Sequence, residues 1–192
     1  MIHQIFNNNQ LVLASASPRR VRIFQMLGLK FVIKPARIDE AISTDNPRKL
    51  VITHATQKAK AVADEFDSSV CVVGADTVVY IDGKILGKPE NHQQAITYLQ
   101  MLSNKKHAVY TGICLVRGKK IVSGWERTYV YFDQLSPADI EDYIATGEPL
   151  DKAGAYGIQG YGSQFITKLT GCYFNVMGFP VHLFNQLLKE FS

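Results

Sequence analysis

The chain has 192 residues, of which 46% are hydrophobic and 20% charged, and its mean hydropathy is -0.03. These values are typical of a globular chain of one-domain size and exclude disorder as the dominant state. No apolar run approaches the roughly 20 residues that cross a bilayer, and residues 1–10 lack the basic flank and apolar core of a secretory signal.

The charge and the cysteines exclude further classes of protein. There are 21 Lys and Arg against 17 Asp and Glu, a net charge of +4, and the bases are spread along the chain. This spread favours a mildly basic surface over nucleic-acid binding. The three cysteines are odd in number and far apart, so neither a disulfide framework nor a zinc site is indicated. We therefore expect a cytoplasmic protein with no nucleic-acid and no membrane partner.

Apolar periodicity, caps and glycines predict helices and strands in alternation. Helices are expected at residues 18–28, 46–66, 91–103 and 136–147 and from residue 180 onward. Strands are expected at residues 11–14, 70–73, 78–81, 107–116, 121–132 and 165–169. We expect Ser17 to cap the first helix, and Asp82 and Gly83 to form a hairpin turn. No linker or repeat divides the sequence, so residues 1–192 are expected to form a single α/β domain with a mixed sheet.

A first candidate site lies between the first strand and the first helix. Ser15, Arg19 and Arg20 fall in the turn that joins these two elements. Free N–H groups at a helix start favour phosphate, and two guanidinium groups there can clamp its oxygens. The same residues also fit a surface turn with two solvated arginines, and the spacing alone does not decide between these interpretations.

Lys58 lies on the apolar stripe of the second helix, with Val51, Ala55 and Val62 spaced around it. The commoner outcome for such a lysine is that its ammonium group reaches the surface along the helix. The alternative is that it points into a cleft that the helix lines.

Asp76 interrupts what would otherwise be a buried strand. An acid there is costly unless it is paired, binds a metal ion or activates water. A structural carboxylate that caps a turn is an equal alternative. Lys88 follows the predicted hairpin and adds a basic group at a turn.

Residues 148–164 carry four glycines and predict a shaped loop. Glycine lets the backbone approach a ligand closely, and the side chain of Gln159 can both donate to and accept from a base edge. The loop matches neither a Walker loop nor a dinucleotide-binding fingerprint. Composition alone fits a binding loop and an ordinary ordered loop equally well.

Five segments carry a family resemblance. They are residues 13–20 (LASASPRR), 74–79 (GADTVV), 87–89 (GKP), 107–112 (HAVYTG) and 148–160 (EPLDKAGAYGIQG). In this order, and spread over nearly the whole chain, they resemble the Maf family of nucleoside triphosphate pyrophosphatases. Two positions depart from the family pattern: Asn104 stands where glycine is usual and Cys172 where aspartate is usual. Both positions lie outside the residues that carry the chemistry and affect local turn geometry instead.

The resemblance implies a fold akin to the inosine triphosphate pyrophosphatases, in which a twisted mixed sheet with flanking helices forms two lobes around a cleft. It implies release of pyrophosphate from a nucleoside triphosphate with a divalent cation, Mg²⁺ or Mn²⁺, as cofactor, and a homodimer. The sequence GIQG at residues 157–160 is similar to the branch that acts on dTTP and UTP, and modified pyrimidine nucleotides remain open. The alternative is a nucleotide-binding regulator of cell division and septum formation, which would not require Asp76.

The resemblance also implies roles for single residues. Asp76 corresponds to the proton acceptor, although the sequence does not separate that role from holding the metal, whose ligands stay unassigned. The residues that bind phosphate are expected to be Ser15, Arg19, Arg20, Lys58 and Lys88. Glu40 matches an acidic position that assists metal or water. Substrate choice is expected to depend on Arg19, Thr77 and Gln159.

Overall fold

The computed structural model describes residues 10–191, in which seven strands form one mixed sheet. The strands are β1 (Leu11–Leu13), β2 (Val32–Ile33), β3 (Cys71–Ile81), β4 (Lys84–Leu86), β5 (Lys106–Arg117), β6 (Lys120–Phe132) and β7 (Ile166–Thr170). Their order is β2-β1-β3-β5-β6-β7, with β4 paired to β3 beside this path. β1 is parallel to β2 and β3, and the other pairs are antiparallel.

Six helices flank this sheet in the described part of the chain. They are α2 (Pro18–Met26), α3 (Pro47–Ala63), α4 (His92–Leu102), α5 (Pro137–Ala145), α6 (Tyr173–Val176) and α7 (Val181–Phe191). Three 3₁₀ turns follow α5, namely η1 (Glu148–Asp151), η2 (Ala153–Ala155) and η3 (Tyr161–Phe165). The α/β class with a mixed sheet, as predicted, is confirmed.

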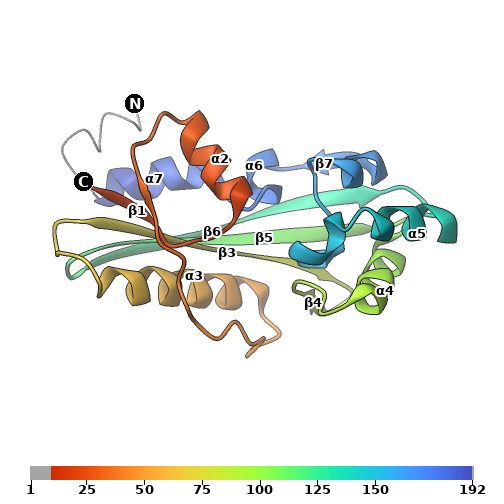
Figure 1. Ribbon diagram of the computed structural model, residues 1–192, viewed down its shortest axis with the longest axis horizontal. Coiled ribbons are helices and arrows are strands. Elements are labelled where there is room, and N and C mark those ends of the chain that lie inside the picture. The colour runs from red at the N-terminus through yellow and green to blue at the C-terminus, as the bar shows by residue number, and fades with distance from the viewer. Residues whose placement is uncertain (1–9, 192) are drawn as a thin grey trace.

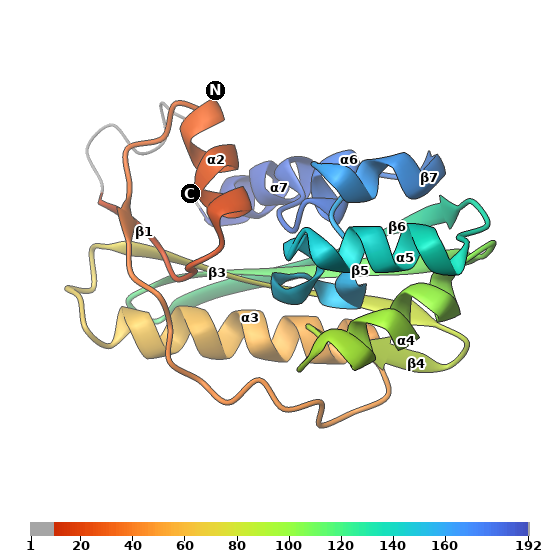
Figure 2. The same ribbon diagram turned by 45° about the vertical axis from the view of Figure 1, so that its right-hand side comes forward.

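The long strands β3, β5 and β6 run through both halves of the molecule (Figure 1). At one end a buried apolar core joins β1 and these strands to α2 and α7. At the other end a second core joins them to α4 and α5. Helix α3 covers the opposite face of the sheet from α6 and α7 (Figure 2). The expected arrangement of two lobes is therefore present, with one continuous sheet as their common floor.

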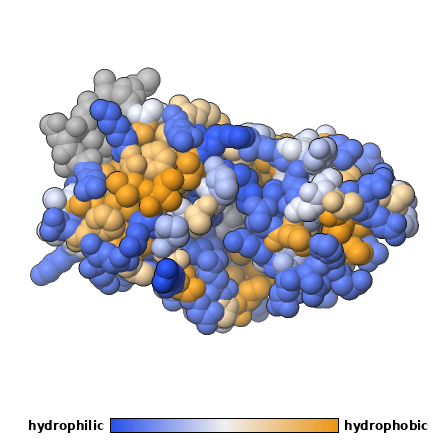
Figure 3. Space-filling view, in the orientation of Figure 1, coloured by the Kyte–Doolittle hydropathy of each residue, from blue (hydrophilic) through white to orange (hydrophobic). Residues whose placement is uncertain are grey.

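The broadest apolar patch on the surface in the orientation of Figure 1 lies at one end of the molecule. Figure 3 shows a mainly hydrophilic surface around the middle, with an apolar patch at the end that carries α2. The exposed large apolar side chains at this end include Met26, Val32 and Ile33, from α2 and the edge strand β2. In the described residues, no helix is long and apolar enough to cross a membrane. Residues 1–10 were predicted not to form a secretory signal. Apart from Gln10, they lie outside the described residues.

Several boundaries follow the predicted signals. Asn46 and Asn91 accept hydrogen bonds at the starts of α3 and α4, and Ser136 forms a capping box with Asp139 at the start of α5. Helix α2 begins at Pro18 as predicted, but the Ser17 side chain makes no capping hydrogen bond, so that expectation is wrong. The sequence also gave no signal for the two-residue strand β2 or the four-residue helix α6.

The strand β3 corrects the sequence-based prediction of two short strands. Except for Val70, the predicted strands at residues 70–73 and 78–81 are parts of one strand of 11 residues, since β5 pairs with it continuously from Val72 to Tyr80. The pairing with β5 satisfies the backbone groups on that edge of the polar residues Asp76 and Thr77, which therefore lie inside a strand. The interpretation of Asp76 as a carboxylate that caps a turn is consequently wrong.

The other edge of β3 is interrupted at the same place. β1 pairs with β3 only as far as Val73, and β4 joins the same strand from Val79 onward. Residues 74–78 therefore lie at a gap in the sheet between β1 and β4. Because side chains alternate along a strand, Asp76 faces α3 while Thr77 faces the opposite side. This gap gives a ligand access to both side chains.

Candidate active site

A cavity of about 850 Å³ opens at the gap beside β3. It is lined from both lobes, by the turn before α2, the face of α3, the gap in β3 and the start of the glycine-rich loop. Eight of the nine predicted site residues line it: Ser15, Arg19, Arg20, Glu40, Lys58, Asp76, Thr77 and Lys88. The fold thus brings together residues that lie far apart in the sequence.

Two glycines bring α3 close to the sheet. A Cβ atom at Gly74 in β3 would collide with the carbonyl oxygen of Ala55, and one at Gly112 in β5 with that of Val51. The helix backbone therefore lies directly against both strands. Because His54 and Lys58 are one helical turn apart, both reach the neighbouring carboxylate of Asp76.

Asp76 is held by two side chains of α3. Lys58 Nζ donates to Asp76 Oδ1 at 2.7 Å, and His54 Nδ1 lies 3.1 Å from Oδ2. Lys58 Nζ also lies 3.0 Å from Glu40 Oε2. The Lys58 side chain is only 8% exposed, so the expectation that its ammonium group reaches the surface is wrong, and the cleft-facing alternative is confirmed.

The pairing keeps Asp76 ionised. Burial alone would raise the pKa of Asp76, but the His54 hydrogen bond, Lys58 and the charge of Arg20 outweigh it and lower that pKa. The hydrogen bond with Asp76 in turn raises the pKa of His54, against the effect of burial. The site therefore holds the carboxylate in its anionic form, which can bind a cation or accept a hydrogen bond from water.

Arg20 is fixed in the wall of the cavity by three hydrogen bonds. Its Nε donates to the Gly178 carbonyl at 2.8 Å, Nη1 to Ser15 Oγ at 3.0 Å and Nη2 to Thr77 Oγ1 at 3.1 Å. Burial lowers the pKa of Arg20 to about 10, with Asp76 opposing this effect, so the side chain stays charged at neutral pH. A rigid, buried guanidinium with further N–H groups is a well-prepared anion binder.

Arg19 and Lys88 are more exposed than Arg20. Arg19 Nη1 lies 3.4 Å from Asp151 Oδ2, an ion pair that joins α2 to η1 of the other lobe. Such an exposed pair contributes little to stability, so it leaves Arg19 available to an anion. Lys88 is exposed where it lines the cavity. The cavity therefore offers cations both at its floor and at its rim.

The glycine-rich segment is a shaped loop, as predicted. Glu148 organises it: Oε1 accepts from the Tyr143 hydroxyl and the Gly162 N–H, and Oε2 from the Tyr161 N–H. Gly160 has a φ of 83°, and a Cβ there would collide with the Glu148 carboxylate. Gln159 is half-buried beside Ile158, which lines the cavity, but Gln159 itself is not among the lining residues.

Sequence reasoning missed His54 and Gly178. A usable signal for His54 was its position four residues before Lys58, on the same face of the helix. Gly178 acts through its backbone carbonyl, for which a side-chain pattern carries no signal.

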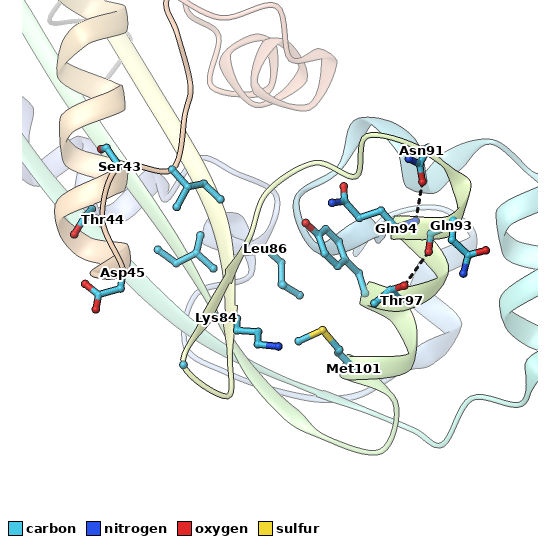
Figure 4. Close-up of a pocket in the computed structure, with 14 residues that line it drawn as sticks. Ser43, Thr44, Asp45, Lys84, Leu86, Asn91, Gln93, Gln94, Thr97 and Met101 are labelled. Carbon is cyan, nitrogen blue, oxygen red and sulfur yellow. Dashed lines mark hydrogen bonds between the residues drawn. The ribbon is translucent and has the colours of Figure 1, made fainter.

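A second pocket lies next to the cavity and shares Ile42, Gln94 and Tyr98 with it. It measures about 1000 Å³ and is formed by residues 42–45, the β4 hairpin and α4 (Figure 4). Its volume exceeds that of the cavity at β3, but none of its lining residues is a buried charged group. The chemistry therefore places the candidate active site at β3.

The geometry defines a class of protein that binds a polyanion beside a buried carboxylate. The family model for Maf-like proteins matches residues 10–191, and the chain belongs to this family. A dTTP/UTP pyrophosphatase from Caldicellulosiruptor saccharolyticus is 42% identical over 187 residues, which cover 94% of each chain. One from Symbiobacterium thermophilum is 44% identical over 184 residues, covering 95% of this chain and 94% of that protein.

Among solved structures, a HAM1 protein from Coxiella burnetii resembles the chain with a TM-score of 0.48 and 14% sequence identity. The match covers 82% of this chain and 80% of that one.

Proposed function

We propose that this protein is a nucleoside triphosphate pyrophosphatase that hydrolyses dTTP and UTP to the monophosphate and pyrophosphate. The observation that carries the proposal is the buried Asp76 carboxylate, held by Lys58 and His54 in a cavity walled by cations. Curated relatives at 42% and 44% identity over nearly the whole chain, named dTTP/UTP pyrophosphatase, support the substrate class.

In this mechanism the cations prepare the triphosphate for attack by water. Arg20 and Lys58 at the floor, with Arg19 and Lys88 nearer the rim, neutralise the phosphate oxygens. Water attacks the α-phosphorus, its proton passes to Asp76, and the bond from the α-phosphorus to the bridging oxygen breaks. The electron pair of that bond leaves with pyrophosphate. No covalent nucleophile is needed, because pyrophosphate is a good leaving group once its charge is neutralised.

The residues present fit a divalent cation, Mg²⁺ or Mn²⁺, as cofactor. Within residues 10–191, no group of three or more His, Cys, Asp or Glu side chains is placed to hold a metal ion alone. Asp76 and Glu40 nevertheless supply carboxylate oxygens on either side of Lys58. Mg²⁺ is usually held by one or two carboxylates together with substrate phosphates, which matches this donor set. When bound, the cation would neutralise charge on the triphosphate.

Gln159 is the proposed reader of the base. Uracil and thymine present one acceptor and one donor at O4 and N3–H, which a single carboxamide can satisfy together; cytosine reverses that pattern, so discrimination requires the loop to hold the amide in one orientation. Modified pyrimidines that keep this edge belong to the same class. Because Gln159 lies beside a lining residue rather than on the cavity wall, this role requires the loop to turn its side chain toward the base.

The cellular location and assembly of the protein extend the proposal. The three cysteines are unpaired in the structure, which supports a reducing cytoplasm. The homodimer implied by the family resemblance stays a prediction.

The test is pyrophosphate release from a panel of dTTP, UTP, CTP, ATP and GTP under one metal condition. The proposal expects dTTP and UTP to have the highest kcat/KM, and omission of the divalent cation to abolish turnover. Nucleotide binding without release of pyrophosphate would favour a regulator of cell division instead. Preference for a purine nucleotide would contradict the substrate class.

A further inference from the structure

His54 is a buried polar residue on α3 with only 4% of its surface exposed. Its Nδ1 lies 3.1 Å from Asp76 Oδ2, on the opposite oxygen from the one that Lys58 contacts. His54 lines the same cavity as Glu40 and Ala41, which precede α3 in the chain. The imidazole therefore lies between the carboxylate on β3 and the segment that carries Glu40.

Two hydrogen bonds, one to each oxygen, fix the plane of a carboxylate, whereas a single hydrogen bond does not. The torsion that turns an aspartate carboxylate is broad, so a single hydrogen bond at Oδ1 leaves the group free to rotate about that contact. A flexible lysine restricts it little, since the ammonium group donates in several directions. The second contact, from a ring that is itself buried, fixes both oxygens.

We propose that His54 is a positioning residue, whose Nδ1–H donates to Asp76 Oδ2 and holds the carboxylate plane toward the attacking water. This inference rests on the proposed function, in which Asp76 accepts the proton of that water. Proton transfer requires hydrogen-bond geometry, so a rotated carboxylate slows the chemical step. Binding of the triphosphate depends on the cations instead and is expected to change little.

Three variants separate the N–H donor from the shape and the charge of the ring. His54→Leu fills the space without a donor. His54→Asn places an amide nitrogen near the position of Nδ1, whereas His54→Gln places one near Nε2. An exposed histidine of α7 gives the matched control, His182→Asn.

The primary measurements are kcat and KM for dTTP, with the melting temperature of each variant. We expect His54→Leu to lower kcat by about 10- to 100-fold, as for losing the outer hydrogen-bond partner of a metal-ligating side chain. KM should stay within about threefold, since binding is unaffected. His54→Asn should recover most of the loss, His54→Gln should not, and His182→Asn should match the unaltered protein.

Other kinetic outcomes overturn the inference. A kcat for His54→Leu near that of the unaltered protein shows that Asp76 needs no second partner. Equal losses in the Leu and Asn variants show that charge or ring shape matters rather than the donor. A loss of kcat that follows a fall in melting temperature in all three variants assigns His54 to stability alone.

Crystal structures of the Leu and Asn variants give a readout that does not depend on turnover. The Asp76 carboxylate is expected to keep its plane in the Asn variant and to rotate in the Leu variant, and an unchanged plane in both overturns the inference. If the unaltered protein releases no pyrophosphate from any nucleotide, the proposed function fails. The crystallographic comparison still decides whether His54 orients Asp76.

Discussion

The two neighbouring cavities differ in whether the charged side chains in their walls are buried. The cavity at β3 holds the buried charged residues Arg20, Lys58 and Asp76, at 8%, 6% and 6% exposure. The pocket between α4 and the β4 hairpin is larger but carries its charges, Asp45 and Lys84, on exposed positions. Burying a charge costs several kcal/mol unless it is well paired. Three buried charges at one gap in the sheet therefore indicate a chemical site more clearly than the volume of a cavity does.

The largest expected effect follows from removing the negative charge of Asp76. Asp76→Asn keeps the shape and one acceptor oxygen, so the variant should fold and bind nucleotide within about tenfold of the unaltered protein. Turnover should fall by roughly 10² or more, the size of a lost general base. The measurements are single-turnover kinetics and calorimetric titration with dTTP. Turnover near that of the unaltered protein would remove Asp76 from the mechanism.

Replacing the buried lysine of the cavity should have a larger effect than replacing the exposed one. Lys58→Met should weaken triphosphate binding by about 1.5–3 kcal/mol, the range for a hydrogen bond to a charged group. It should also lower the melting temperature, since Asp76 loses its partner at 2.7 Å. Lys88→Met, at an exposed position of the same cavity, is the matched control.

For Lys88→Met we expect a loss of only about 0.2–1 kcal/mol in binding, as for exposed ion pairs, with no change in melting temperature. Calorimetric titration and thermal unfolding of both variants check the pair. If Lys58→Met loses stability but binds dTTP normally, Lys58 supports Asp76 and does not contact the phosphates.

The sequence allowed more of the cavity to be predicted than of its internal contacts. The polar turn before α2 and the acid inside β3 were visible because each breaks an apolar pattern locally. The direction of Lys58 was not predictable, because it depends on the close approach that Gly74 and Gly112 permit between α3 and the sheet. The spacing of His54 to Lys58 was visible in the sequence, but the contact of His54 with Asp76 depends on the same close approach. The single strand β3 was divided in the prediction because its partner β5 stabilises polar residues that the local pattern disfavours.

Gln159 tests whether the glycine-rich loop belongs to the charged cavity. Gln159→Ala should lower kcat/KM for dTTP and UTP by about 10-fold, and change it little for CTP and the purine nucleotides. The expected loss is smaller than for Asp76 because a base contact is remote from the reacting phosphorus. A uniform loss on all five nucleotides would indicate that the variant alters the loop held by Glu148 rather than base recognition.

The smallest effect is expected in the neighbouring pocket, and it decides whether the two cavities act separately. Thr97 and Lys84 line that pocket alone, whereas Tyr98 lines both cavities and is unsuitable for this test. Thr97 and Lys84 are both exposed. The hydroxyl of Thr97 donates a hydrogen bond within α4, to the Gln93 carbonyl at 3.0 Å. Surface changes of this kind usually alter stability by no more than about 0.5 kcal/mol.

Thr97→Ala and Lys84→Ala should therefore leave kcat/KM for dTTP within about twofold, because a triphosphate is bound by charge and this pocket buries none. Steady-state kinetics on dTTP and UTP, with Lys88→Met measured in parallel, provide the comparison. A rise in KM as large as that for Lys88→Met would mean that the nucleotide extends past Tyr98 into the second pocket. The two cavities would then be one site, in which the charged part binds phosphate and the neutral part binds the nucleoside.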